Sequence, residues 1–162
     1  MKLNKKKKGF TLIELMAVIA IVAILAAVLV PTVSGYIERS KKTALITQVR
    51  NVVNAVEIYN STAPDADKIA DAKTIATLVA ADATKGLTGT ETKFVNQEFL
   101  SADDVSKLNV SLSYEQLKNI NSDSNAMNGI YKSKTDGDNK GKFVYKIGEN
   151  EVLLEYVAPS VS

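Results

Sequence analysis

The sequence predicts an α+β protein with one long N-terminal helix, followed by a small head of short helices and a C-terminal antiparallel sheet. Three observations predict this fold class. Residues 15–30 are apolar and uncharged, apolar residues then recur at helical spacing as far as Tyr59, and the C-terminal part alternates apolar with polar residues. The 162 residues are therefore enough for a membrane-length helix and one small domain.

A basic leader precedes the apolar run. Lys2 and Lys5 to Lys8 lie before Gly9, and such lysines keep an N-terminus on the cytoplasmic side of a membrane, with the rest of the chain outside. From Phe10 to Val30 the only ionisable residue is Glu14, and this length suffices to cross a bilayer as a helix. A central acid costs about 2.5 to 3.5 kcal/mol, so insertion tolerates Glu14 without explaining its presence.

Two ordinary interpretations of this segment stay open. A secretory signal peptide would be cut after the apolar region, where Ala26 to Val28 or Ser34-Gly35 fit only loosely. An uncleaved single-pass anchor that carries a binding domain explains the length and the basic leader. Neither interpretation gives a role to Glu14 beside Gly9 and Phe10.

The stretch Gly9-Phe10-Thr11-Leu12-Ile13-Glu14-Leu15-Met16 resembles the class III signal peptide of type IV pilins and their pseudopilin relatives. The resemblance implies that a membrane aspartyl peptidase cuts between Gly9 and Phe10 and methylates the new N-terminal Phe10. It also implies that Glu14 pairs with the N-terminal ammonium of a neighbouring subunit. A carboxylate in hydrocarbon needs such a partner. The motif-level likeness covers about residues 5 to 31, and the lack of cysteine favours a Gram-positive-like relative.

Pro31 matches the proline that the family usually has after the apolar run. It lacks the N–H that would bond the carbonyl of Ala27, so a helix kink or local melting is expected near residues 27 to 31. Many relatives carry glycine where this chain has Ala23, so any segment that melts in a filament should start after Ala23. The resemblance implies a pilin-like architecture with a cleaved leader (1–9), a transmembrane and assembly half of the helix (10–30), an amphipathic half (31–60) and a globular head (61–162).

One helix is predicted from about Thr11 to Tyr59, because apolar residues after Pro31 share one helical face. These residues are Ile37, Leu45, Val49, Val52, Val53, Val56 and Tyr59. The head should pack on this stripe.

Short helices are predicted in the first part of the head. Residues 65–82 have helical period, with Asp71 as N-cap. Ser101 to Asp104 and Ser113 to Gln116 fit capping boxes, which would open helices to Leu108 and Ile120, and residues 119–128 are expected to be loop. The residues expected to supply core contacts are Phe94, Val95, Phe99 and Leu100.

The C-terminal part contains three candidate strands, at 129–134, 142–147 and 151–157. Pairing Ile147 with Val152 places both apolar sets on one face and leaves Glu149-Asn150 as the tip of the hairpin. The residues expected to face inward are Phe143, Tyr145, Ile147, Val152, Leu154 and Tyr156.

Composition excludes several kinds of site. The chain has neither cysteine nor histidine, which excludes cysteine–histidine zinc sites and cysteine or histidine catalysis. Asp103 and Asp104 are adjacent rather than opposed, which makes them a poor acid–base pair. We therefore expect no enzyme and no cofactor.

Two charged clusters near the C-terminus suggest ligands. Asp136, Asp138 and Asn139 suggest a calcium loop, but Lys140 and Ile147 occupy ligand positions of an EF-hand, and a hairpin turn is the favoured interpretation.

Five lysines would suit DNA or another anionic surface, although a solvated strand face is favoured. These are Lys132, Lys134, Lys140, Lys142 and Lys146. Most of the basic charge lies in the leader: without its five lysines the formal charge is +2 − 5 = −3, so the basic composition is not evidence for nucleic-acid binding.

The resemblance implies a structural subunit that is processed and polymerised through its N-terminal helices into a surface filament for adhesion, motility or aggregation. Its partners would be further copies of itself, a prepilin peptidase and methyltransferase, and the pilus assembly machinery, with a host surface or DNA as candidate ligands of the head. It would lie in the cytoplasmic membrane as a single-pass precursor and then in an extracellular filament. The alternatives are a pseudopilin of type II secretion or DNA uptake, and the uncleaved anchored domain.

Overall fold

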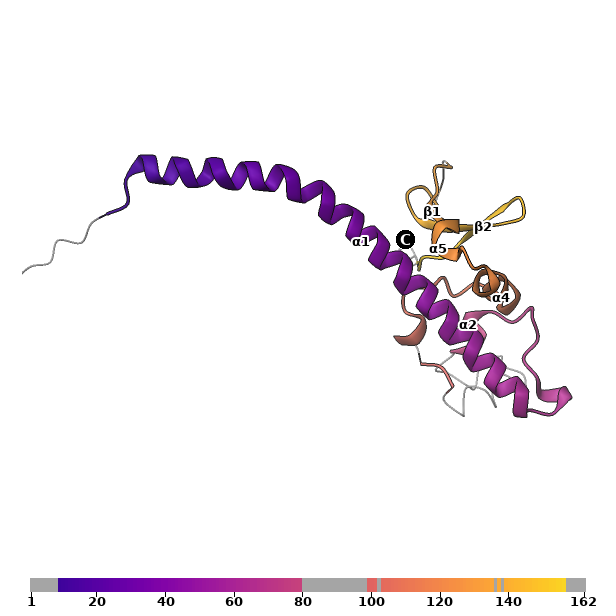
Figure 1. The fold of residues 1–162 in the computed structure, drawn as a ribbon. Coiled ribbons are helices and arrows are strands. Elements are labelled where there is room, and N and C mark those ends of the chain that lie inside the picture. The colour runs from indigo at the N-terminus through magenta and orange to yellow at the C-terminus, as the bar shows by residue number, and fades with distance from the viewer. Residues whose placement is uncertain (1–8, 80–98, 102, 136, 138, 157–162) are drawn as a thin grey trace, which may run out of the picture. The chain divides into compact units, whose positions relative to one another are not determined.

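The computed structural model describes residues 9–79, 99–101, 103–135, 137 and 139–156. Contacts divide the chain into two compact units, Met1–Ser40 and Lys41–Ser162, which are described separately. Helix α1 (Leu12–Thr62) passes from the first unit into the second (Figure 1). The long helix expected from about Thr11 to Tyr59 is therefore confirmed, and it continues to Thr62.

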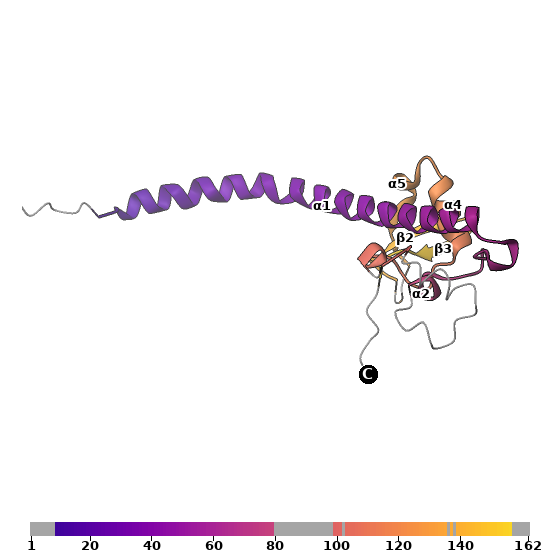
Figure 2. The same cartoon turned by 90° about the horizontal axis from the view of Figure 1, so that it is seen from below.

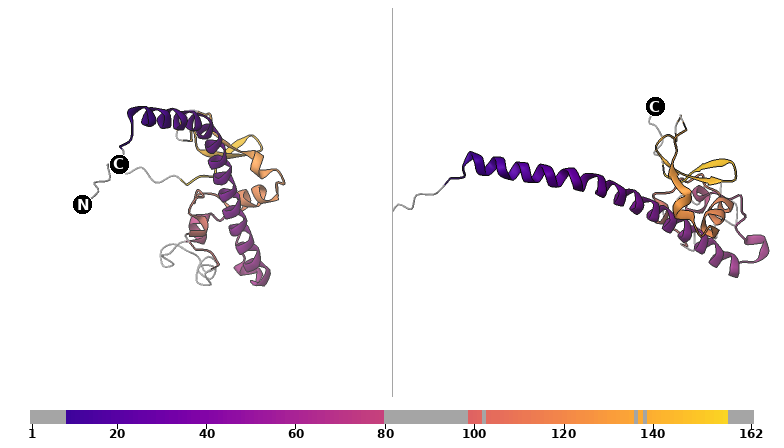
Figure 3. Two further views of the ribbon diagram at one scale, coloured as in Figure 1. Left: turned by 60° about the vertical axis from the view of Figure 1, so that its left-hand side comes forward. Right: turned by 45° about the horizontal axis from the view of Figure 1, so that its top comes forward.

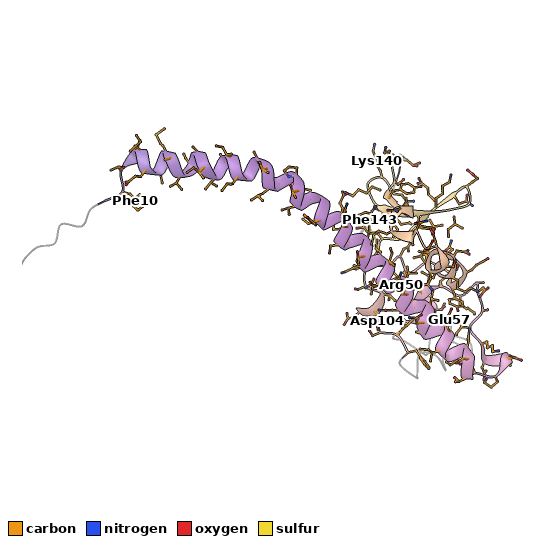
Figure 4. All side chains as sticks on the ribbon, in the orientation of Figure 1. Phe10, Arg50, Glu57, Asp104, Lys140 and Phe143 are labelled. Atoms are coloured by element: carbon orange, nitrogen blue, oxygen red, sulfur yellow. The ribbon has the colours of Figure 1, made fainter. Side chains whose placement is uncertain are left out.

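The first unit consists of the early turns of α1 and the residues just before them. Every described residue from Gly9 to Ser40 is exposed, and the side chains of the apolar run project around the helix (Figure 4). Helical backbone continues through Pro31 without a break. Local melting is therefore not seen in the isolated chain, and the kink stays a prediction.

The second unit has its core on the later turns of α1, which lie beside α4 and the sheet (Figures 2 and 3). Ile37 was wrongly predicted to join the core stripe, because it lies in the first unit and is 51% exposed. The residues of α1 that are buried are Leu45, Ile46, Val49, Val52, Val53, Ala55, Val56 and Tyr59. Phe99 packs edge-on against Tyr59 with ring centroids 5.6 Å apart, whereas Phe94 and Val95 lie outside the described residues.

The chain after α1 is less helical than its period predicts. It forms a 3-10 turn, η1 (Asp65–Asp67), and a four-residue helix, α2 (Ile75–Leu78), with Thr74 at the N-cap. The prediction of Asp71 as N-cap is wrong. Its backbone carbonyl instead accepts the N–H of Glu115 at 2.9 Å, while its carboxylate meets Lys118 Nζ at 2.6 Å, so tertiary contacts override the local helical tendency here.

Both predicted capping boxes are present. Ser101 N and Oγ donate to Asp104 Oδ2 at 2.9 and 2.7 Å, but the helix that follows is only the 3-10 turn η2 (Asp103–Val105). Ser113 and Gln116 cap α4 (Tyr114–Ser122) reciprocally. The expected loop at 119–128 is corrected, because α4 runs to Ser122 and α5 (Ala126–Gly129) follows.

The sheet is antiparallel with the order β1 (Ile130–Lys132), β2 (Phe143–Ile147), β3 (Asn150–Leu153). The predicted register is wrong by two residues, since Tyr145 rather than Ile147 lies opposite Val152, and Ile147 lies opposite Asn150. Gly148 explains the difference: its φ of +61° allows a two-residue turn, Gly148-Glu149, where a longer tip was expected. A shift by two residues keeps the same side chains on the same face.

The third strand ends earlier than predicted. Both Leu154 N and Glu155 N lie near Phe143 O, at 3.0 and 3.4 Å, so two residues oppose one, as in a β-bulge. Leu154 is buried as expected, but Tyr156 is 46% exposed rather than inward. Val157 lies outside the described residues. The observed elements nevertheless confirm the α+β, pilin-like fold class.

Candidate assembly segment and head surface

The predicted cleavage site lies just before the first turn of α1. Gly9 and Phe10 have no helical assignment, Phe10 is 87% exposed, and a Cβ at Gly9 would meet no atom within 4 Å. Figure 4 shows Phe10 at the start of the helix. The peptide bond between Gly9 and Phe10 is therefore accessible and outside any helical hydrogen bond, while the leader residues 1–8 lie outside the described part of the chain.

Thr11 and Glu14 form a capping box at the helix start. Thr11 N and Thr11 Oγ1 both donate to Glu14 Oε2 at 2.8 Å, and Glu14 N donates to Thr11 Oγ1 at 3.3 Å. Within the described residues Glu14 Oε1 accepts no hydrogen bond. One carboxylate oxygen thus satisfies two donors of the first turn, and the other remains open to a partner.

The apolar run is not covered by any residue that the structure describes. Helix α1 is long and apolar enough to cross a membrane by length and composition, and no part of its most apolar window is buried. The run exposes large side chains from Phe10 to Val33. Exposed apolar surface on this scale indicates contact with lipid or with other protein.

Hydroxyl groups flank the predicted kink. Thr32 Oγ1 donates to Val28 O and Ser34 Oγ to Val30 O, each at 3.1 Å. Such back-bonding competes with the backbone ladder, and Pro31 supplies no N–H to it. The helical ladder therefore lacks one hydrogen bond at this proline.

The charge of the C-terminal hairpins does not favour an anionic ligand. Residues 129–156 contain five lysines, but also two aspartates and three glutamates, so their formal charges cancel. Lys146 Nζ lies 3.5 Å from Glu149 Oε2, and Lys132 Nζ lies 5.8 Å from the centre of the Phe143 ring. Lys140, labelled in Figure 4, lies in the loop between β1 and β2.

The calcium loop stays a prediction. Asp136 and Asp138 lie outside the described residues, and Asn139 uses its backbone carbonyl to accept Lys142 N at 3.0 Å. Among the residues that the structure describes, no three acidic, histidine or cysteine side chains form a group that would hold a metal ion.

Two polar clusters of the head could not be predicted from sequence spacing. The Glu151 carboxylate accepts bonds from Ser133 Oγ at 2.8 Å, Tyr131 Oη at 2.9 Å and Thr135 Oγ1 at 3.3 Å. The hydrogen bonds from Ser133 and Tyr131 hold the pKa of Glu151 below its ordinary value. The partners lie on a different strand and its following loop, so only the observed sheet register brings them together.

The second cluster joins Tyr145 to Asp123. The Tyr145 hydroxyl donates to the Asp123 carboxylate, which lowers the pKa of Asp123. Burial, followed by this contact, raises the pKa of Tyr145 to about 12. The pair ties β2 to the end of α4.

The N-terminal part of the chain matches one protein family and several curated proteins. The family described as "Prokaryotic N-terminal methylation motif" matches residues 4–30. The "Type IV wide pilus major component PilA4" of Thermus thermophilus is 46% identical over 55 residues, which are 34% of this chain and 42% of that protein. A "Fimbrial protein" of Pseudomonas aeruginosa is 45% identical over 53 residues, 33% of this chain and 34% of that protein.

Secretion proteins also match. The "Type II secretion system core protein G" of Escherichia coli is 36% identical over 59 residues, which are 36% of this chain and 41% of that protein. The chain therefore spans less than half the length of these curated relatives in its matches. No solved structure matched the chain.

Proposed function

We propose that this chain, which resembles type IV pilins in its N-terminal motif and its fold, is the precursor of a structural filament subunit. In this proposal a prepilin peptidase cuts between Gly9 and Phe10 and the new N-terminus is methylated. The subunit then leaves the cytoplasmic membrane and polymerises into an extracellular filament. Adhesion or motility would follow from the filament, with the head on its outside.

One observation carries the proposal: an apolar helix surface that no described residue covers contains a single carboxylate, Glu14. Lipid covers such a surface before assembly, and equivalent helices of other copies cover it afterwards. Removing Gly9 and the leader creates a cation at Phe10, four residues from Glu14. Pairing that amine with Glu14 of a neighbouring copy satisfies two charges in a medium of low dielectric constant, which sets the axial position of each new subunit.

The open oxygen of Glu14 supports this role. Oε2 is engaged by Thr11 of the same chain, so Oε1 is the atom available to an incoming ammonium. The N-cap and the intermolecular pair then use different oxygens. A subunit can keep the first turn of α1 intact while it docks.

A pseudopilin of type II secretion is the second candidate function, because the core G proteins of that system are among the relatives. Such a subunit would use the same helix contacts in a short filament within the cell envelope. Long fibres sheared from the cell surface favour the pilin, whereas a subunit that stays with the secretion components favours the pseudopilin.

The proposal is tested with Glu14→Gln and intact-mass analysis of the membrane and of sheared fibres. Glutamine keeps an oxygen for the Thr11 cap but removes the charge. We expect cleavage and methylation at Phe10 as in the wild type, with few filaments. Glu38→Gln is the matched control, because it removes an exposed acid of the same helix beyond the apolar run, and its filament yield should be normal.

Two results contradict the proposal. Wild-type filament yield from Glu14→Gln removes the charge pairing. A mature protein that still begins at Met1 and stays in the membrane supports the uncleaved anchored domain instead. Gly9→Ala should leave precursor in the membrane, which separates a failure of processing from a failure of assembly.

A further inference from the structure

The outer edge of β3 borders an open pocket on the head. The pocket has a volume of about 310 Å³ and is lined by Asn109, Ser111, Leu112, Gln116 and residues 150–153. All of these lie in the second unit. The pocket is therefore independent of the N-terminal half of α1 and of the filament assignment.

Part of this edge is already covered by the chain itself. Asn109 N donates to Leu154 O at 2.7 Å and Tyr156 N donates to Lys107 O at 2.9 Å, with an antiparallel bridge between Leu108 and Glu155. The side chain of Asn109 then donates through Nδ2 to Leu153 O at 3.3 Å. These contacts along the edge of β3 end at Leu153, which also lines the pocket.

The remaining edge presents unpaired backbone groups. In an antiparallel strand the N–H and C=O of one residue point to the same side, and the side alternates along the strand. Because Leu153 O points outward to Asn109, the backbone N–H and C=O of Glu151 and the N–H of Leu153 also point outward. These three groups face the pocket with no partner among the described residues.

Apart from Glu151, the side chains that line this pocket are neutral. Gln116 uses its Oε1 to cap α4, accepting Ser113 N at 3.0 Å, so its Nε2 amide remains a donor toward the pocket. The lining also includes three apolar residues, buried Leu112 and half-buried Val152 and Leu153. The one charged residue, Glu151, directs its carboxylate across the sheet to Tyr131 and Ser133, away from the edge.

We propose that this pocket is a docking site for an extended, uncharged peptide segment of a partner protein, which adds a short strand to β3. The guest backbone accepts from the N–H groups of Glu151 and Leu153 and donates to the carbonyl of Glu151, as in recognition by strand addition. Small side chains of the guest contact half-buried Val152. A charged guest is disfavoured, because the pocket offers no opposite charge.

The test is an NMR titration of the full-length, isotope-labelled chain in detergent micelles. The probe is a blocked hexapeptide of alternating valine and threonine. We expect saturable shifts of the backbone amides of Glu151 and Leu153 and of the Gln116 side-chain amide. The same peptide with every backbone nitrogen methylated cannot donate a hydrogen bond along either edge, so its affinity should fall about tenfold or more.

Two variants make the test specific. Gln116→Glu keeps an acceptor for the capping box but replaces the amide donor by a carboxylate, so peptide binding should weaken while the thermal midpoint stays close to the wild type. Glu115→Gln is the matched control on the neighbouring position of α4 and should bind normally. Absence of saturable shifts at millimolar peptide overturns the proposal, as does equal binding of the methylated peptide.

Discussion

Gly129 allows the Tyr145 ring to pack against the end of α5, and replacing it by alanine is the sharpest test of the head packing. A Cβ at position 129 would lie 2.5 Å from Tyr145 Cε2, 3.2 Å from Cδ2 and 3.3 Å from Cζ. Ordinary carbon–carbon contacts lie near 3.5 to 4.0 Å. The ring cannot swing aside freely, because Tyr145 is only 7% exposed and its hydroxyl is bound by Asp123.

The magnitude follows from two opposing effects. Adding a methyl group to a packed site costs about 1 to 3 kcal/mol. Alanine recovers at most about 1 kcal/mol through its better helix propensity at the end of α5. We therefore expect Gly129→Ala to lower the free energy of unfolding of the head by about 1 to 2 kcal/mol.

The assay is urea denaturation of the full-length chain in micelles, followed by far-ultraviolet circular dichroism. Tyr145→Leu supplies the matched background, because leucine lacks the ring atoms that the new Cβ would strike. In that background Gly129→Ala should be neutral or slightly stabilising. An equal loss in both backgrounds would refute the reasoning, since the cost would then come from the backbone at 129 and not from the ring.

Three further predictions concern single contacts. Thr11→Val removes the N-cap beside Glu14 at a cost of about 1 kcal/mol, so hydrogen exchange in the first turn of α1 should quicken about fivefold. Thr11→Ser keeps the hydroxyl and should exchange at the wild-type rate. Unchanged exchange in Thr11→Val would exclude the cap. The pKa of Tyr145, raised from 10.0 to about 12, adds stability that is present below about pH 10 and lost as pH rises toward 12. Urea midpoints against pH should fall more in the wild type than in Tyr145→Phe, in which the raised pKa values of Tyr131 and Tyr114 still contribute. Gln48→Ala deletes the acceptor of Lys107 N at 2.9 Å and should cost about 1 kcal/mol, with faster exchange at that amide, whereas Gln48→Glu keeps the acceptor and slow exchange.

The long helix and both capping boxes were predictable because their signals are local. Apolar spacing along α1 and the residue pairs Ser101/Asp104 and Ser113/Gln116 encode contacts within a few residues. The N-terminal motif is local too, so the position of the candidate cleavage site could be read directly from Gly9 and Phe10.

The errors arose where distant parts of the chain decide the structure. Asp71 bonds to α4 and does not cap a helix in its own segment. Its backbone carbonyl accepts the N–H of Glu115, and its carboxylate pairs with Lys118. The register of the hairpin depends on the positive φ of Gly148, which alternation of apolar residues does not reveal. The open edge of β3 depends in turn on that register and on Asn109, so the sequence contained no local signal for it.

The buried position of Leu154 has a consequence for the biogenesis of the subunit. Leu154 shares one core with residues of α1 that are synthesised much earlier, such as Val49 and Val56. The head core therefore stays incomplete until the ribosome has passed β3. A chain truncated before this point lacks the last buried side chain of the head core, and we expect it to be more open to proteolysis than the full chain. Complete packing of the head therefore requires synthesis of the chain as far as Leu154.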